Sequence, residues 1–259
     1  MLDDAKSDRK LAAAPLDRKP TAAPLATRAA RPWRLALVTA VLGVVVFTAL
    51  ALLVPRAATD GLDAAVLRTL RQLDDSRLPL GGDMVLYAAR DITALGGTVV
   101  LMIVVGLVVG YLMVDRRLRD AVAVLAASIG GLLLVVLLKL LFARDRPSIV
   151  PHLVITHSAS FPSGHSMLSA VIYPTLGALL ARFAKRRGTQ VLPIAAAIAI
   201  TFLVGVSRLV LGVHYPTDVL AGWSAGAAWA GFSWLAVDRL VRQGKVEGRE
   251  NDAPESSAR

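Results

Sequence analysis

The chain of 259 residues contains no cysteine, and only 5% of its residues are aromatic. The absence of cysteine excludes disulfide bonds, thiolate catalysis and cysteine-ligated metal sites. Acidic residues are also in deficit, because 19 Asp and Glu accompany 29 Lys and Arg, for a formal net charge of +10. The basic residues cluster at the ends of apolar runs, so no basic face on a soluble element remains for nucleic acid. We therefore expect no nucleic-acid partner.

Apolar residues make up 55% of the sequence, and several uninterrupted runs approach the roughly 20 residues that cross a bilayer. The first run is too long for the hydrophobic region of a signal peptide and follows a long tail, so we expect it to be retained. The predicted fold class is all-α, a polytopic membrane helix bundle. Its six expected transmembrane helices lie near residues 33–54, 92–114, 120–142, 165–183, 191–210 and 217–237.

The remaining segments complete the predicted organisation. Residues 1–32 are rich in Ala, Pro and basic residues and are expected to form a disordered cytoplasmic tail. Residues 33–240 form one domain, and residues 241–259 form a second disordered cytoplasmic tail. Within 56–90, apolar residues recur at helical spacing between charged ones, which predicts an amphipathic surface helix between spans one and two. The recurring residues are Leu62, Val66, Leu70 and Leu73.

Basic loops predict the orientation. If there are six spans, the basic clusters after spans two, four and six share one side with the N-terminal tail, and the positive-inside rule makes that side cytoplasmic. The clusters are Arg116, Arg117 and Arg119; Arg182, Lys185, Arg186 and Arg187; and Arg239, Arg242 and Lys245. We expect a multi-pass protein of the inner (plasma) membrane with both termini in the cytoplasm.

Polar residues that apolar spans do not explain gather on the opposite, periplasmic or extracellular face. Lys139 lies near the end of span three, where a lysine can simply snorkel to the interface. Ser163 precedes span four, where it can be a plain helix N-cap. Arg208, His214 and Asp218 lie around the turn between spans five and six. Because cations converge at helix N-termini, the set favours an anion site, most readily for phosphate.

His214 and Asp218 are about one helical turn apart. The carboxylate can accept a hydrogen bond from one imidazole nitrogen and leave the other nitrogen free for attack. The same pair could instead ligate zinc. Lys139, Arg146 and Arg208 would repel a metal cation there, so we expect neither a metal nor a cofactor.

These residues form three motifs: Lys139-x6-Arg146-Pro147, Pro162-Ser163-Gly164-His165 and Ser207-Arg208-x5-His214-x3-Asp218. Together they resemble the three-part signature of the type 2 phosphatidic acid phosphatase (PAP2) superfamily, in its membrane lipid phosphatase branch. Every signature position is filled in the right order.

The resemblance implies a role for each matched residue. His214 would attack phosphorus and form a phosphohistidine, while Asp218 holds its tautomer and His165 acts as general acid and then general base. The other matched residues would bind the non-bridging oxygens; they are Lys139, Arg146, Arg208, Ser163 and the Gly164 amide.

Two alternatives belong to other classes. Intramembrane charges mark pathways in transporters and channels, but here they gather at span ends and not at the midplane. Vanadium haloperoxidases resemble the same superfamily, yet they are soluble proteins. We therefore expect a lipid phosphatase whose partners are the bilayer and a lipid phosphate. Undecaprenyl diphosphate is the favoured substrate, with phosphatidylglycerophosphate, phosphatidate and a phosphorylated lipid A as alternatives. The sequence does not indicate an oligomeric state.

Overall fold

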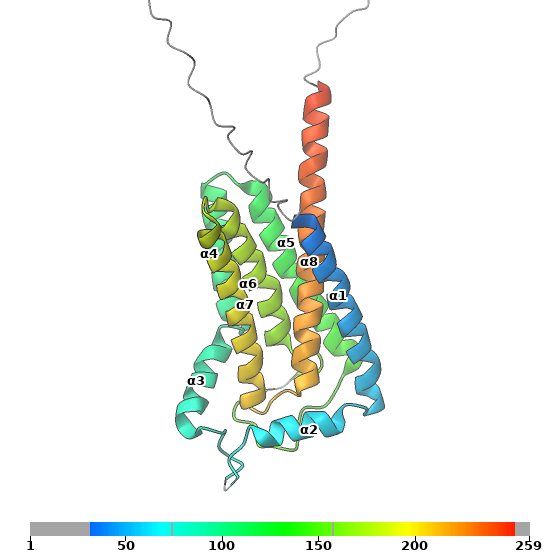
Figure 1. The fold of residues 1–259 in the computed structure, drawn as a ribbon, viewed down its shortest axis with the longest axis vertical. Helices are drawn as coiled ribbons and strands as arrows, with labels where there is room; N and C mark the ends of the chain where they lie inside the picture. Colours follow the sequence, from blue (N-terminus) through cyan, green and yellow to red (C-terminus); the bar gives the residue numbers. More distant parts are fainter. Residues whose placement is uncertain (1–31, 74, 157, 252–259) are drawn as a thin grey trace, which may run out of the picture. The chain divides into compact units, whose positions relative to one another are not determined.

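The computed structural model describes residues 32–73, 75–156 and 158–251, and its elements are helices (Figure 1). The described residues contain no β-strand beyond a single bridge between Arg71 and Pro79, which confirms the all-α class. The helices are α1 (Pro32–Leu53), the 3-10 helix η1 (Val54–Arg56), α2 (Asp60–Thr69), α3 (Gly82–Ala94), α4 (Thr98–Val114), α5 (Leu118–Phe142), α6 (Gly164–Phe183), α7 (Arg187–Val210) and α8 (Pro216–Asn251).

The two predicted tails are only partly open to comparison. Residues 1–31 of the expected N-terminal tail lie outside the described residues. At the other end, α8 continues to Asn251, so it extends into the segment 241–259, of which 252–259 lie outside the described residues.

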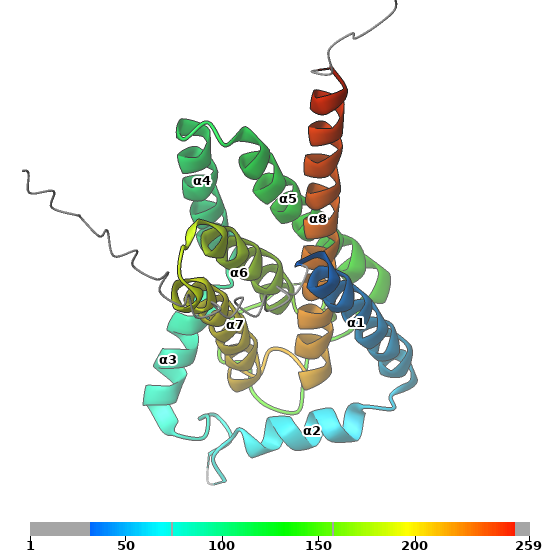
Figure 2. The same ribbon diagram turned by 45° about the horizontal axis from the view of Figure 1, so that its top comes forward.

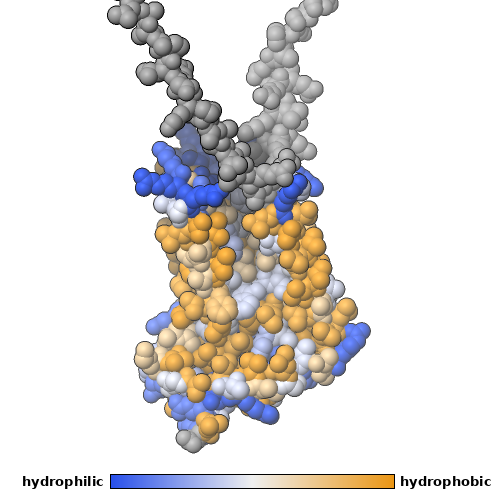
Figure 3. Space-filling view, viewed as in Figure 1, coloured by the Kyte–Doolittle hydropathy of each residue, from blue (hydrophilic) through white to orange (hydrophobic). Residues whose placement is uncertain are grey.

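Four described helices are long and apolar enough to cross a membrane: α1, α5, α6 and α7. The bent pair of α3 and α4 makes a fifth if it counts as one span. Figure 3 shows a band of apolar residues around these helices, with hydrophilic residues beyond it at both ends. Leu42 of α1, Leu107 of α4 and Leu140 of α5 are among the exposed apolar side chains, as expected for surfaces that face lipid.

Helix α8 is less apolar than these four helices because it is rich in Gly, Ala, Ser and Trp. Its small residues allow close approach to neighbouring helices. A Cβ at Gly231 would lie 2.7 Å from the Ala36 carbonyl oxygen of α1, and a Cβ at Gly226 would lie 2.5 Å from the Met167 carbonyl oxygen of α6. Figures 1 and 2 both show α8 running beside α1. Its composition therefore suits packing against helices on both sides.

Helix α6 is the centre of the bundle. It packs against α5, α7 and α8, and Met167 and Val171 on it are completely buried. The indole of Trp229 on α8 donates to the Ala127 carbonyl of α5 at 2.8 Å, and that of Trp223 donates to the Thr201 carbonyl of α7 at 3.1 Å. These two hydrogen bonds join α8 to α5 and to α7, the helices that surround α6.

The expected span 92–114 is not one straight helix. Helices α3 and α4 meet at an angle of 45°, and Gly96 and Gly97 lie in the break. A Cβ at Gly96 would lie 2.4 Å from Cγ1 of Val204 on α7 and 3.2 Å from Cβ of His165 on α6. Glycine therefore lets the break lie directly against both helices.

The segment 56–90 forms two helices where the sequence predicted a single amphipathic one. Pro79 and two glycines in left-handed conformations, Gly81 (φ +92°) and Gly82 (φ +68°), separate α2 from α3. Leu62 is 65% exposed, as a lipid-facing residue would be, whereas Asp63 beside it is completely buried. The charged face of α2 is thus turned partly toward the protein.

The basic turns and the motif residues lie at opposite ends of the bundle. Arg182, at the end of α6, forms an ion pair with Asp120, at the start of α5, at 3.3 Å. The Arg117 guanidinium lies 4.3 Å from the ring centroid of Phe183. The α4–α5 and α6–α7 turns therefore share one end, and α2 lies at the other end (Figure 1).

Candidate active site

All eight predicted site residues lie at the end of the bundle opposite the basic turns. Two are near the C-terminal ends of α5 and α7, and the others lie in adjacent loops or at the start of α6 and α8. In order they are Lys139 in the last turn of α5, Arg146 in the following loop, Ser163, Gly164 and His165 at the start of α6, Arg208 in the last turn of α7, His214 in the α7–α8 loop and Asp218 in the first turn of α8.

Ser163 is the N-cap of α6, as its position before an apolar helix predicts. Its Oγ accepts hydrogen bonds from the Ser166 N–H at 3.4 Å and from the Ser166 hydroxyl at 2.9 Å. The backbone N–H of Ser163 donates to the Asp218 carbonyl at 2.9 Å. The N-terminal ends of α6 and α8 are thereby joined, and helix N-termini attract anions.

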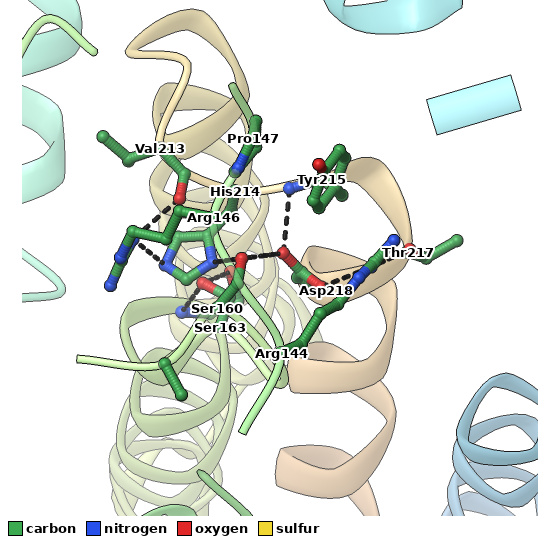
Figure 4. A network of polar contacts seen from close by, with 12 residues as sticks. Arg144, Arg146, Pro147, Ser160, Ser163, Val213, His214, Tyr215, Thr217 and Asp218 are labelled. Carbon is green, nitrogen blue, oxygen red and sulfur yellow. Dashed lines mark hydrogen bonds and ion pairs between the residues drawn. The ribbon is translucent and has the colours of Figure 1, made fainter. Parts of the chain in front are cut away.

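The imidazole of His214 lies between a carboxylate and a guanidinium and is 2% exposed (Figure 4). Its Nδ1 is 3.5 Å from Oδ2 of Asp218, and its Nε2 is 3.3 Å from Nη1 of Arg146. Burial lowers the pKa of His214 to about 4, although Asp218 opposes this change. The ring is therefore neutral near pH 7, and a proton on Nδ1 leaves a lone pair on Nε2, facing Arg146.

The three predicted cations approach the site from different elements. The Lys139 ammonium donates to the Ala159 carbonyl and to the Ser158 hydroxyl. The Arg146 guanidinium donates from Nε to the Ser158 carbonyl at 2.8 Å and from Nη1 to the Val213 carbonyl at 2.7 Å. A Cβ at Gly164 would lie 3.4 Å from Cε of Lys139, so the start of α6 contacts this lysine directly.

Arg208 is buried, with 3% of its surface exposed. Its Nη1 donates to the Thr93 hydroxyl of α3 at 2.8 Å, and its buried Nε has no hydrogen-bond partner within the described part of the chain. Since a buried cation is costly without acceptors, this guanidinium is suited to receive an oxygen from a bound anion.

His165 lies against the break between α3 and α4. A Cβ at Gly97 would be 4.0 Å from Nε2 of His165. His214, Arg208, Lys139 and Arg146 are all within electrostatic range of His165. The two predicted catalytic histidines and the predicted cations therefore share one site.

Sequence reasoning missed four residues that contact this set. The Ser160 hydroxyl donates to Oδ2 of Asp218 and lies 3.4 Å from Nδ1 of His214. Thr93 holds Arg208, and Arg144 and Asp63 extend the contacts of Asp218 toward α2. Only Arg144 carried a sequence signal, because it lies two residues before Arg146 in Arg144-Asp145-Arg146-Pro147.

Metal sites in proteins are commonly built from groups of three or more His, Cys, Asp and Glu side chains. Residues 32–73, 75–156 and 158–251 contain no such group. The charged groups that face His214 are instead mainly cationic, with Asp218 as the carboxylate in contact with the ring.

Comparison with known proteins agrees with this geometry. The model of the PAP2 superfamily matches residues 120–242, which contain all three motifs. Phosphatidylglycerophosphatase B of Bacillus subtilis is 38% identical over 138 residues, a match that covers 52% of this chain and 66% of that protein. An undecaprenyl-diphosphatase of Sulfolobus acidocaldarius is 32% identical over 88 residues, covering 34% of this chain and 38% of the relative. The chain thus spans about two thirds or less of these relatives.

The fold is also similar to a solved structure. The crystal structure of a transmembrane PAP2-type phosphatidylglycerolphosphate phosphatase from Bacillus subtilis aligns with a TM-score of 0.66 and 27% sequence identity. The alignment covers 78% of this chain and 96% of that one. With three ordered motifs, a helical membrane fold and these matches, the chain belongs to the PAP2 superfamily.

Proposed function

We propose that the protein is a metal-independent lipid phosphatase that hydrolyses a phosphomonoester or diphosphate through a phosphohistidine at His214. The observation that carries this proposal is the position of the His214 imidazole. Its Nδ1 faces Asp218 and its Nε2 lies 3.3 Å from the Arg146 guanidinium. A phosphate oxygen bound by Arg146 would therefore bring phosphorus next to the free ring nitrogen.

In the first step, Nε2 of His214 attacks phosphorus, and the bond from phosphorus to the lipid oxygen breaks. His165 protonates that leaving oxygen. Charge develops on the three equatorial oxygens of the transferring group, so positioned cations and amides supply most of the stabilisation. Lys139, Arg146 and Arg208 provide the cations, and Ser163 and the Gly164 amide complete the site.

In the second step, water attacks the phosphohistidine. His165 removes a proton from this water as the new P–O bond forms and the P–N bond breaks. Inorganic phosphate leaves and His214 returns to its neutral state. His165 keeps the proton that it took from water, so on loss of the product it is again the general acid for the next substrate.

The phosphate site does not by itself distinguish one lipid from another. Undecaprenyl diphosphate is the substrate that the sequence favoured, and a relative from Sulfolobus acidocaldarius carries that activity in its name. Phosphatidylglycerophosphate is the second candidate, favoured by the larger share of the chain that aligns with the Bacillus subtilis phosphatidylglycerophosphatase sequence and with the crystal structure from that organism. A panel of these lipids, with phosphatidate and lipid A phosphates, assayed for released phosphate in detergent, decides among them.

We further propose six spans, with the bent pair α3–α4 as the second and α8 as the sixth. Both termini are then cytoplasmic, and the site lies on the periplasmic or extracellular face of the plasma membrane. The separation of the basic turns from the site supports this orientation. A substrate headgroup would enter from the outer leaflet.

The nucleophile is tested by His214→Ala and by acid quenching. The substitution should lower kcat by several orders of magnitude, as loss of a nucleophile does, and quenched wild-type enzyme should carry acid-labile, base-stable phosphate on His214. Activity should survive EDTA, and orthovanadate should inhibit. A variant that retains more than about a tenth of wild-type kcat would remove His214 from this role.

The orientation is tested by single cysteines, since the chain has none of its own. Ile155 is 86% exposed in the loop between the first two motifs, and Thr189 is exposed beside the Arg186-Arg187 cluster. Ile155→Cys should react with a membrane-impermeant maleimide in intact spheroplasts, and Thr189→Cys only after permeabilisation. The reverse pattern would place the site in the cytoplasm.

A further inference from the structure

A buried carboxylate of α2 lies at the beginning of a chain of contacts that ends at His214. Asp63 is completely buried. Its Oδ1 accepts from the Thr217 N–H at 3.1 Å, and its Oδ2 accepts from the Thr217 hydroxyl at 2.6 Å. The same Oδ2 accepts from Nη2 of Arg144 at 3.1 Å. Asp63 therefore joins α2 to the first turn of α8.

Arg144 connects this carboxylate to a second one. Its Nη1 donates to Oδ1 of Asp218 at 2.8 Å and to the Thr217 hydroxyl at 2.9 Å. Its guanidinium lies over the Tyr215 ring, 4.1 Å from the centroid. Burial opposes the charge, but Asp218 and Asp63 outweigh it and raise the pKa of Arg144. One cation is thus shared between two completely buried carboxylates, and Figure 4 shows its contact with Asp218.

Asp218 is held on every side. Arg144 occupies its Oδ1, while its Oδ2 accepts from the Tyr215 N–H at 2.9 Å and from the Ser160 hydroxyl. The direct distance from Oδ2 to Nδ1 of His214 is 3.5 Å, which is long for a hydrogen bond. Small displacements of Asp218 would therefore decide whether this contact closes when substrate binds.

We infer that Asp63 and Arg144 are positioning residues that fix the ionised carboxylate of Asp218 and, through it, the ring of His214. This role rests on the proposed function of His214 as nucleophile. Neither residue belongs to the three motifs, and the hydrogen-bonding nitrogens of Arg144 are directed at Asp63, Asp218 and Thr217. The contribution of α2 to the reaction is thus a single buried charge.

The structure supplies a matched control for that charge. Asp60 is on the same helix and lies 3.5 Å from the same Arg144 nitrogen, but its side chain is 61% exposed. Asp63→Asn and Asp60→Asn make the same chemical change in buried and exposed settings. An Asn at 63 keeps the shape and one acceptor oxygen, which can still accept from the Thr217 N–H. Its amide nitrogen cannot accept, so the substitution removes the charge together with the acceptor for Arg144 and the Thr217 hydroxyl.

We expect Asp63→Asn to lower kcat by about ten- to hundredfold, since small misplacements of catalytic groups cost this much. KM should stay within about a factor of two, because the phosphate ligands are untouched. Asp60→Asn should leave kcat within about a factor of two, because an exposed ion pair contributes little.

The pH dependence of kcat/KM separates positioning from general damage. The charged or titratable groups that face His214 are Asp218 on α8, Arg146 after α5, Arg208 on α7 and His165 on α6. Activity is lost at low pH where His214 becomes protonated, which gives the kcat/KM profile an acid limb. Removing the cation of Arg144 next to Asp218 favours protonation of His214, so Arg144→Gln should move this limb to higher pH by about one unit. Removing the negative charge of Asp63 should move it downward. Arg144→Lys, which keeps the charge, should retain the wild-type limb.

The assay measures phosphate release by each purified variant from about pH 3 to pH 9. At pH values where a variant stays folded, the position of the acid limb does not depend on the amount of active enzyme, so a variant obtained in low yield can still be compared. Equal kcat values and limbs for the Asn variants at 63 and 60 would overturn the inference, as would limbs that move in the same direction for Asp63→Asn and Arg144→Gln. An active His214→Ala variant would instead contradict the proposed function itself.

Discussion

The contact between Thr93 and Arg208 offers a test that does not require knowing the lipid. Thr93→Val removes the hydroxyl that accepts from Nη1 of Arg208 at 2.8 Å and preserves the shape of the side chain. Nε of Arg208 already has no partner within the described residues, and the side chain is 3% exposed. The variant therefore leaves a buried cation with still fewer acceptors.

Hydrogen bonds to charged groups contribute about 1.5–3 kcal/mol. A loss of about 2 kcal/mol lowers Tm by roughly 4–8 °C in a protein of this size. A phosphate-like ligand replaces the missing acceptor, so saturating orthovanadate should raise the Tm of Thr93→Val by at least as much as that of the wild type. The destabilised variant should thus recover part of its deficit on binding.

The measurement is thermal unfolding in detergent, at one scan rate, with and without orthovanadate. Thr175→Val is the control, because its hydroxyl donates to the Val171 carbonyl of its own helix and carries no charge. We expect a decrease in Tm of less than about 3 °C there. If Thr93→Val matches the control, or gains less than the wild type from orthovanadate, Arg208 is not the unsatisfied cation that the structure indicates.

Three further predictions follow from packing and titration. Gly222→Ala should lower both Tm and kcat, because its Cβ would lie 2.6 Å from the Ser163 carbonyl oxygen. The control Gly106→Ala meets nothing within 4 Å and should lower neither Tm nor kcat. Thermal unfolding gives Tm and phosphate release gives kcat. Ser160→Ala should reduce kcat by about tenfold or more, because Asp218 loses a donor, and an unchanged kcat would exclude Ser160 from holding the carboxylate. Burial lowers the pKa of His214 to about 4, below the ordinary value of about 6.5. As pH decreases, the imidazole is therefore protonated in the unfolded chain before it is protonated in the folded protein. Thermal stability should therefore fall as pH decreases across that window, less steeply in His214→Ala, and a slope that the substitution leaves unchanged would contradict this assignment.

The eight motif residues were predictable because each lies at a span end, where apolar helices leave few reasons for charge. The pattern of Lys139, His165 and His214 predicted that these residues share one face, whereas the chemistry assigned to them stays a prediction. The helical class and the approximate extents of α1, α5, α6 and α7 were equally readable from long apolar runs.

The roles of Asp63 and Thr93 could not be predicted from the sequence, and the reason is physical. A charged residue between Leu62 and Val66 has the pattern of a solvated helix face, and only the docking of α2 on α8 turns it inward. Thr93 lies in a segment that reads as part of an apolar span, and its role depends on the bend at Gly96 and Gly97. Tertiary contact, and not local pattern, determines both.

The hydrogen bonds of Arg71 to two distant parts of the chain limit where segments of this protein can be exchanged with a relative. Arg71 is 4% exposed, and it donates to the Val210 carbonyl at 2.7 Å and to the Pro151 carbonyl at 3.3 Å. It thus joins the C-terminal end of α7 to the loop that follows α5, from a point about fifty residues before the region 120–242 that matches the family model. A chimera that transplants the motif region alone would lack these two hydrogen bonds of Arg71. Exchange of active sites between relatives should therefore carry α2 and the following turn along with the motifs.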